Sequence, residues 1–263
     1  MKINIYQINA FAEKVFEGNS AAVCLLESWL ESKTLQNIAT ENNLSETAFV
    51  VPKADNCFEI RWFTPTTEVA LCGHATLAAA YVLWQFCQVV NNTVYFESKG
   101  GELIVRREGE WITLDFPADE IQPISTPLVS YAFDVKIEEA YKGKTDYLLI
   151  TIDEQAVRKA KPNLEVISNL EARGVILSAR SETVDFVSRF FAPQYGINED
   201  AVTGSAHTTL AVYWAKTLRK NNFEAKQLSA RKGYLRCQLA GKRVLISGKA
   251  QTYLVGEIFI PEV

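Results

Sequence analysis

Two segments of this chain, residues 74–81 and 207–214, carry nearly the same phrase. The first reads HATLAAAY and the second HTTLAVYW, and each begins with one of the only two histidines in the sequence. A glycine precedes each phrase closely, and an aromatic-x-Pro step lies further upstream, at residues 63–65 and 191–193. Because the similarity extends beyond one helix, we expect the chain to consist of two related halves.

Both repeated segments predict helices that are buried on all sides. Residues 75–87 contain a single strongly polar side chain, Gln85, and residues 208–215 carry no charge. A helix without a polar face lies inside a core rather than on a surface. We therefore expect each half to curl a sheet around its own central helix.

The beginnings of these two helices predict an anion-binding site. The first N–H groups of a helix have no acceptor within the helix and carry partial positive charge. Gly73 and Gly204 stand at these beginnings, where a glycine lets a ligand approach the backbone closely. If the halves pack about an approximate two-fold axis, both helix beginnings converge on one cleft, and a carboxylate is the expected ligand.

The composition is that of an ordinary globular protein. The 263 residues are 48% hydrophobic with a net charge of −4, and a chain of this length buries roughly three quarters of its unfolded surface. Its lysines and arginines do not cluster with aromatic residues, which argues against nucleic-acid binding. No segment has the apolar length of a signal peptide or a membrane span, and five cysteines without a C-x-x-C pair fit reduced thiols. We expect a cytoplasmic protein that binds neither nucleic acid nor membrane.

Alternating hydrophobic residues predict strands on both sides of each central helix. The clearest of these strands are expected at residues 3–8, 59–63, 103–105, 111–114, 174–177, 184–187, 235–239, 243–246 and 253–260. Strands before and after a buried helix imply a mixed sheet curled around it, which is an α+β fold. The segment 116–119 ends the first half, so we expect an N-terminal domain of residues 1–117 and a C-terminal domain of residues 118–251.

Glu46 is the acid whose position most favours a role in chemistry. It lies between a short amphipathic helix and an apolar strand, which is a poor position for a solvated charge. The corresponding stretch of the second half, residues 173–177, contains no acid. Glu46 is therefore expected to be a single proton carrier whose pKa is raised toward neutrality by burial. The alternative is an exposed loop acid or a structural ion pair.

Three further polar residues stand at the helix beginnings. Asp200 and Ser205 precede the second helix, where N-terminal capping is the alternative to a role in binding. His74 opens the first helix and is either an acid/base group or an interior imidazole that caps its own helix. Cys72 and His74 resemble a metal pair only faintly, because two histidines leave too few ligands, and we expect no metal.

No nucleotide-binding or hydrolase motif occurs in the sequence. The patterns GxxxxGK[ST], GxGxxG and GxSxG are all absent, so we expect no cofactor. Proton transfer at a carbon next to a carboxylate or imine needs one carboxylate base in a dry cleft and donors for the developing negative charge. That reaction class fits the candidate residues.

Five motifs follow one another along the chain. They occupy residues 16–23, 45–49, 61–65, 72–78 and 200–207. In this order they resemble the motifs of the phenazine-biosynthesis PhzF-like isomerases, a branch of the diaminopimelate epimerase-like superfamily. The resemblance runs from end to end and implies a duplicated fold of two similar domains, each a mixed β-sheet around a central buried helix. It also implies a site between the domains, a homodimer, and a final strand near residues 252–263 that returns to the first domain.

The same resemblance assigns roles to individual residues. In the phenazine enzyme, the glutamate that matches Glu46 moves a proton between carbons of a cyclic diene acid. The helix-start amides that match Gly73 and Gly204 hold the carboxylate of the substrate. The other residues expected at the substrate are Asn19, Cys72, His74, Asp200 and Ser205.

The sequence also departs from the superfamily's epimerases, which use two opposed cysteines. Cys72 stands at the place of the first thiol, whereas Ala201 occupies roughly the place of the second. A two-thiol racemase is therefore not expected. In the first motif, Ser20 replaces a common proline.

The sequence thus predicts a cofactor-independent isomerase that acts on a small carboxylate-bearing molecule. Glu46 would move the proton, while His74 and Asp200 would hold the substrate through hydrogen bonds. Two alternatives remain open. One is a one-thiol racemase or epimerase that uses Cys72, whose pKa a helix beginning can lower. The other is a non-catalytic small-molecule binding protein.

Overall fold

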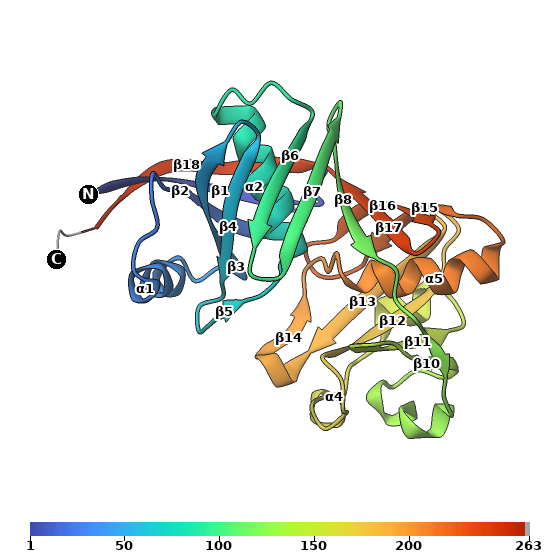
Figure 1. Cartoon of the computed structure of the whole chain (residues 1–263). Helices are drawn as coiled ribbons and strands as arrows, with labels where there is room; N and C mark the ends of the chain where they lie inside the picture. Colours follow the sequence, from blue (N-terminus) through green and yellow to red (C-terminus); the bar gives the residue numbers. More distant parts are fainter. Residues whose placement is uncertain (261–263) are drawn as a thin grey trace. The chain divides into compact units, whose positions relative to one another are not determined.

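The computed structural model of the chain describes residues 1–260, and these residues group into two compact units. The first unit contains Met1–Asp115 together with the C-terminal segment that begins at Ser247, and the second unit contains Phe116–Ile246. In each unit a largely buried helix packs against a mixed β-sheet (Figure 1). None of the helices within residues 1–260 is long and apolar enough to span a membrane.

The first unit builds its sheet from strands at both ends of the chain. Its elements are β1 (Lys2–Ala10), β2 (Asn19–Leu25), α1 (Ser32–Asn42), β3 (Glu46–Ala54), β4 (Cys57–Phe63), β5 (Glu68–Val69), α2 (Gly73–Phe86), β6 (Thr93–Ser98), β7 (Gly101–Glu108), β8 (Trp111–Pro117) and β18 (Ala250–Phe259). The strands lie side by side in the order β18, β1, β2, β3, β4, β6, β7 and β8. The pairs β2–β3 and β4–β6 are parallel and the other neighbours in this order are antiparallel, so the sheet is mixed, as predicted.

The second unit has its own mixed sheet. Its elements are β9 (Gln122–Pro123), η1 (Thr126–Leu128), η2 (Ser130–Ala132), β10 (Ile137–Lys142), β11 (Asp146–Thr151), α3 (Glu154–Lys159), α4 (Leu164–Ser168), β12 (Gly174–Arg180), β13 (Phe186–Ala192), η3 (Pro193–Tyr195), β14 (Ile197–Asp200), α5 (Ala206–Leu218), β15 (Asn222–Gln227), β16 (Gly233–Ala240) and β17 (Arg243–Gly248). The strand order is β9, β10, β11, β12, β13, β15 and β16, with β11–β12 and β13–β15 parallel.

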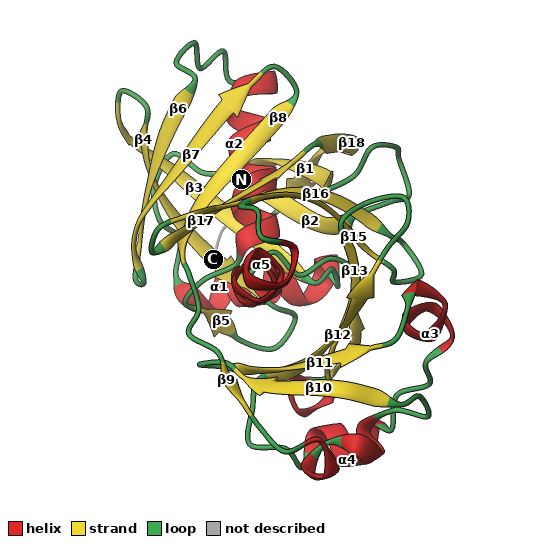
Figure 2. Ribbon diagram, turned by 90° about the vertical axis from the view of Figure 1, so that its right-hand side faces the viewer, coloured by secondary structure: helices red, strands yellow, loops and turns green. Residues whose placement is uncertain are grey.

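The central helices confirm the prediction of helices without a polar face. In α2 the residues from His74 to Trp84 are buried except for Tyr81, which is half-buried. In α5 the buried side chains include those of His207 and Trp214. Figure 2 shows the strands β11, β12, β13, β15 and β16 curving around α5. Burial of these uncharged stretches leaves only the beginning and the last turn of α2 near a polar environment, and the candidate residues stand at that beginning.

The chain's final described strand completes the sheet of the first unit. β18 pairs antiparallel with the whole of β1, from Phe259 opposite Lys2 to Ala250 opposite Ala10. The sequence predicted this strand near residues 252–263. Residues 261–263 of that range lie outside the described part of the chain. Because β18 joins β1, the first unit contains chain segments separated by more than two hundred residues in sequence.

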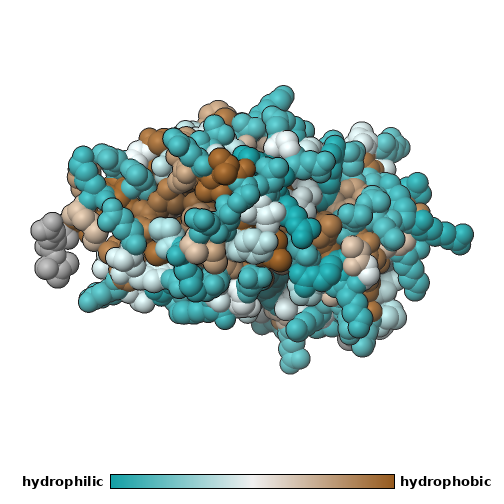
Figure 3. Space-filling view, turned by 45° about the horizontal axis from the view of Figure 1, so that its top comes forward, coloured by the Kyte–Doolittle hydropathy of each residue, from teal (hydrophilic) through white to brown (hydrophobic). Residues whose placement is uncertain are grey.

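Some hydrophobic side chains reach the surface. Figure 3 shows one face on which hydrophobic patches interrupt a mainly hydrophilic surface. In the first unit, β18 exposes Tyr253, Val255 and Phe259. The packing of the first unit therefore leaves these apolar side chains uncovered.

Candidate active site

Three elements of the first unit begin at the same place. Asn19 begins β2 and Glu46 begins β3, and these two strands are parallel with Ala21 opposite Glu46, so their first residues share one edge of the sheet. Gly73 begins α2, directly after Cys72 in extended backbone. Gly18 makes the tight entry into β2 possible, because its φ is +72° and a Cβ there would collide with the carbonyl oxygen of Ala10.

His74 and Glu46 form a buried pair at this edge. The Nε2 atom of His74 lies 3.1 Å from Oε2 of Glu46, and their side chains are only 8% and 13% exposed. The other ring nitrogen, Nδ1, lies 3.5 Å from the Sγ atom of Cys72 and 3.4 Å from Nδ2 of Asn19. The hydroxyl of Ser45 donates to Oδ1 of Asn19 at 3.3 Å. The imidazole of His74 therefore contacts both a carboxylate and a thiol.

The close pair retains hydrogen-bonding capacity. Although Oε2 of Glu46 and Nε2 of His74 lie within ion-pair distance, their alignment is not that of a hydrogen bond, and within the described residues neither atom has another partner. Buried polar atoms in proteins are nearly always hydrogen-bonded, because an unsatisfied one costs about 1–3 kcal/mol. These two atoms are consequently available to a ligand.

The pKa expected for Glu46 was wrong in direction. Burial alone raises the pKa of this carboxyl group, but the positive charge of His74 and the polar contacts of His74 and Cys72 outweigh burial and lower it. Burial opposes a charged imidazole at His74, yet the neighbouring Cys72 and Glu46 outweigh burial and raise the pKa of His74 well above the usual value. The resting pair is therefore a carboxylate beside an imidazolium, and the two groups titrate together.

Cys72 also differs from the expectation that its helix beginning lowers its pKa. Burial and the negative charge of Glu46 raise the pKa of the thiol, and they outweigh the opposing effects of His74 and the backbone. The group is therefore held as a neutral thiol that can donate a hydrogen bond to the pair.

In the second unit, Asp200 ends β14 and braces the turn that leads into α5. Its Oδ2 atom accepts a hydrogen bond from the hydroxyl of Thr203 at 2.5 Å. The buried side chain of Gln227 accepts from the backbone N–H of Thr203 at 2.8 Å and donates to the backbone carbonyl of Asp200 at 3.0 Å. This network fixes the turn that contains Gly204.

Ser205 precedes α5 but does not cap it with its side chain. Its hydroxyl oxygen instead accepts a hydrogen bond at 2.8 Å from Nη1 of Arg173. Arg173 also donates two hydrogen bonds to the buried carboxylate of Asp146, one from Nε at 2.9 Å and one from Nη2. The Ser205 hydroxyl thus acts as an acceptor toward Arg173, and a hydroxyl group also carries one hydrogen that it can donate. Arg173 was not among the residues predicted from the sequence, because its partner Asp146 lies 27 residues away along the chain.

His207 has a structural role that differs from that of His74. Its Nδ1 donates to the carbonyl oxygen of Thr203 at 2.9 Å, and its ring faces Phe186. Complete burial lowers the pKa of His207 to about 4, so the ring is neutral near pH 7. The two histidines of the repeated phrase therefore differ in charge as well as in partners.

The structure thus gathers the candidate residues into two groups. Asn19, Glu46, Cys72, Gly73 and His74 meet in the first unit, and Asp200, Gly204 and Ser205 belong to one turn of the second. Ser205 is the N-cap residue of α5 but makes no side-chain cap hydrogen bond, so the capping explanation of Ser205 does not hold. His74 lies within α2, whose N-cap residue is Cys72, and its ring contacts Glu46, Cys72 and Asn19.

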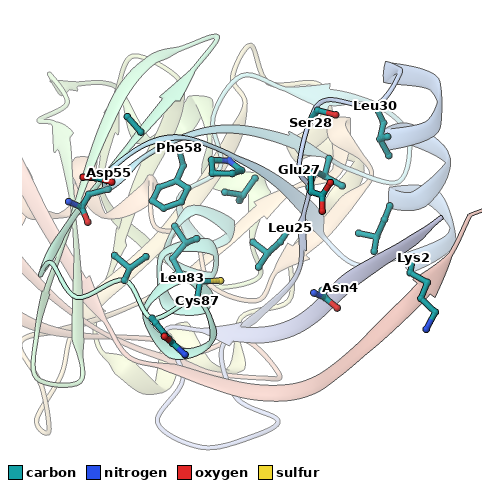
Figure 4. A pocket seen from close by; sticks show the side chains of 18 of the residues that line it. Lys2, Asn4, Leu25, Glu27, Ser28, Leu30, Asp55, Phe58, Leu83 and Cys87 are labelled. Atoms are coloured by element: carbon teal, nitrogen blue, oxygen red, sulfur yellow. The ribbon is translucent and has the colours of Figure 1, made fainter.

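A separate hollow in the first unit does not involve these residues. It has a volume of about 1040 Å³ and lies beside Leu83 and Cys87 of the C-terminal part of α2, with Leu25 and Phe58 also in its wall (Figure 4). His74 is at the opposite end of α2. The hollow is therefore distinct from the group around His74.

Comparisons with known proteins agree with the motifs. The family model described as phenazine biosynthesis-like protein matches residues 8–256. An uncharacterized isomerase of Pseudomonas aeruginosa is 49% identical over 261 residues, covering 99% of this chain and 100% of that protein. A crystal structure of a PhzF-family phenazine biosynthesis protein from Enterococcus faecalis is 45% identical, with a TM-score of 0.95 over 99% of this chain and 100% of that one.

A structure of lower sequence identity has the same fold. A predicted epimerase from Pseudomonas aeruginosa, 22% identical, superposes with a TM-score of 0.80 over 98% of this chain and 100% of that one. The resemblance inferred from the five motifs is confirmed, and the mixed sheets belong to the epimerase-like fold. The chain is a member of the phenazine biosynthesis-like protein family.

Proposed function

We propose that this protein is a cofactor-independent isomerase that moves a proton between carbons of a small carboxylate-bearing substrate. The observation that carries the proposal is the buried Glu46–His74 pair, whose facing atoms lie 3.1 Å apart and lack aligned hydrogen bonds. The naming of a close relative as an isomerase supports the reaction class. Proton transfer at carbon needs a positioned base and an acid that respond to each other, and the pair supplies both.

In the proposed reaction, the Glu46 carboxylate removes a proton from carbon. The electron pair of the broken C–H bond moves into the adjacent unsaturated system of the substrate, and Glu46 becomes a neutral acid. Besides Cys72, the negative charge on Glu46 raises the pKa of His74, so loss of that charge makes His74 a stronger acid at the moment when negative charge develops on the substrate. Glu46 then returns the proton to a different carbon.

Charge that develops on the substrate needs hydrogen-bond donors. The amide at the beginning of α2, at Gly73, is available in the first unit, and Gly204 with the Ser205 hydroxyl supplies donors at the beginning of α5. Asp200 would orient a polar substituent of the substrate. The shared cleft expected from the sequence stays a prediction, and it requires Ser205→Ala and Glu46→Gln to impair the same reaction.

We further infer that the two units are copies of one design. From β1 through β7 of the first unit, successive sheet neighbours are antiparallel, parallel, antiparallel, parallel and antiparallel. The same succession runs from β10 through β16 of the second unit. Thr47 is opposite Phe63 in the first sheet, and Val175 is opposite Phe191 in the second. If Thr47 corresponds to Val175, then the residues just before them, Glu46 and Gly174, correspond to each other. This alignment supports a single proton-carrying acid.

Incubation in D2O tests the proposed reaction class. The full chain is mixed with amino acids, keto acids and cyclic diene acids, and deuterium entry at carbon is followed by NMR. We expect exchange with at least one compound, its loss in Glu46→Gln, and its retention in Glu41→Gln, a matched change of an exposed glutamate in α1. Equal exchange in wild type and Glu46→Gln would refute the role of Glu46. No exchange with any compound would favour a binding protein.

A one-thiol racemase or epimerase is the second candidate. The distance of 3.5 Å between Sγ of Cys72 and Nδ1 of His74 favours it, because the imidazole could exchange a proton with the thiol. In that case Cys72→Ala abolishes exchange while Glu46→Gln does not. The proposed isomerase gives the opposite pattern.

A further inference from the structure

The group at the beginning of α2 combines three kinds of donor atom. Glu46 offers a carboxylate oxygen, Cys72 a sulfur and His74 a ring nitrogen, and one such atom from each lies within 4.8 Å of the other two. Across residues 1–260, this is the one cluster of at least three such side chains with that spacing. This cluster could not be predicted from sequence spacing, because Glu46 is distant in the chain from Cys72 and His74.

The spacing of these donor atoms, and the lack of aligned hydrogen bonds at two of them, suit a bound metal ion. Two ligands bound tetrahedrally to zinc at about 2.0–2.1 Å are separated by roughly 3.3 Å. Oε2 of Glu46 and Nε2 of His74 are 3.1 Å apart, and both are buried without an aligned hydrogen bond. The Sγ atom of Cys72 lies 3.5 Å from Nδ1 of His74, and one donor atom of each of the three side chains lies within 4.8 Å of the other two.

The chemistry of the three donors selects the class of ion. A metal-bound set of thiolate, carboxylate and neutral imidazole carries two negative charges, which a divalent cation neutralises inside a buried site. Sulfur and nitrogen donors favour Zn²⁺ or Co²⁺, whereas Mg²⁺ and Ca²⁺ prefer oxygen ligands alone. Three protein ligands leave a fourth position for water or a ligand carboxylate.

We propose that Glu46, Cys72 and His74 bind Zn²⁺, and that the bound ion is a reversible inhibitor of the protein. The ion occupies the base and its acid partner, so neither can handle a proton while it is bound. The binding stands on the geometry of the three donors. The inhibition rests on the proposed function.

Co²⁺ tests the binding directly, because a thiolate ligand gives it a charge-transfer absorption band. We expect the metal-free full chain to develop this band with Co²⁺ and to lose it when Zn²⁺ displaces the Co²⁺. Cys72→Ser should abolish the band. Glu46→Gln should weaken Zn²⁺ binding by at least tenfold to a hundredfold, the loss that follows even when an outer partner of a metal ligand is removed.

A second thiol–carboxylate pair in the same unit provides the matched control. Sγ of Cys57 lies 3.7 Å from Oε1 of Glu97, with no histidine in the cluster. Cys57→Ser should keep the band at wild-type intensity, and so should Cys87→Ser at the exposed thiol. A wild-type chain without the band, a band that survives Cys72→Ser, or a band that disappears in Cys57→Ser would overturn the site.

Inhibition has its own measurement. On a compound that exchanges in D2O, Zn²⁺ should suppress exchange at the concentrations that displace Co²⁺, a chelator should restore it, and Mg²⁺ should have no effect. Zn²⁺ binding that leaves exchange unchanged would overturn the inhibition. If no compound exchanges, the proposed function fails, whereas the Co²⁺ spectrum still decides the metal site.

Discussion

At the scale of single residues, the protonation of the site depends on His74. The imidazolium lowers the pKa of Glu46 against the effect of burial. In His74→Gln the opposing charge is gone, so burial should dominate and the pKa of Glu46 should rise above its usual value. A carbon-13 NMR titration of the glutamate carboxyl groups measures this, with exposed Glu41 as the internal reference. An unchanged titration of Glu46 would contradict the account.

His207 should make stability depend on acidity. Its pKa is about 4 in the folded chain against the usual 6.5, so folding excludes a proton that the unfolded chain binds. The contribution is complete above about pH 6.5 and is lost as the pH falls toward 4, by about 3 kcal/mol in total. Urea unfolding between pH 7 and pH 4 should show this decline in wild type and a smaller decline in His207→Gln. Equal declines would show that His207 is not the group responsible.

The residue scale also shows what the sequence could predict. Glu46, His74, Asp200 and Ser205 became candidate site residues because motifs record residue types, and their roles stay predictions. The mutual effect of Glu46 and His74 on their pKa values was not accessible, because it depends on a distance of 3.1 Å between side chains from separate elements. Burial was anticipated correctly, but the partner that reverses its effect was not.

At the scale of elements, Arg173 connects the beginnings of three elements through its ion pair with Asp146 and its hydrogen bond to Ser205. Asp146 begins β11, Arg173 directly precedes β12, and Ser205 precedes α5. Because Asp146 is buried, Asp146→Asn removes the carboxylate that binds the guanidinium of Arg173 through two of its nitrogens and should destabilise the chain by about 3 kcal/mol.

The exposed pair of Lys2 and Glu257 is the control for this prediction. Glu257→Gln should lower the unfolding free energy by less than about 1 kcal/mol, because solvent screens a surface pair. Chemical denaturation compares the two variants. Similar losses in both would contradict a special role for the buried pair.

Elements differed in how well the sequence predicted them. The helix over α2 followed from its apolar composition, and the strand β18 from its alternation. The pairing of β18 with β1 could not be derived from periodicity, because an alternating pattern predicts a strand but not the strand beside it. The two strands also lie at opposite ends of the chain. Arg173 was missed for the same reason, since Asp146 is 27 residues away in sequence.

At the scale of the whole molecule, we predict a homodimer. The exposed apolar residues Tyr253, Val255 and Phe259 of β18 are consistent with a surface that is covered in solution. Light scattering coupled to size-exclusion chromatography should give a mass about twice the 29.5 kDa of one chain. A mass of one chain at micromolar concentration would contradict this prediction.

The central claim is that Glu46 carries the proton, and the rate of deuterium entry tests it most directly. On a compound that the wild type exchanges, the initial rate should fall in Glu46→Gln by about a hundredfold or more, the usual contribution of a positioned acid/base group. The variant should retain the wild-type unfolding transition, so that the loss reports chemistry. A folded Glu46→Gln variant that exchanges deuterium at the wild-type rate would contradict the account.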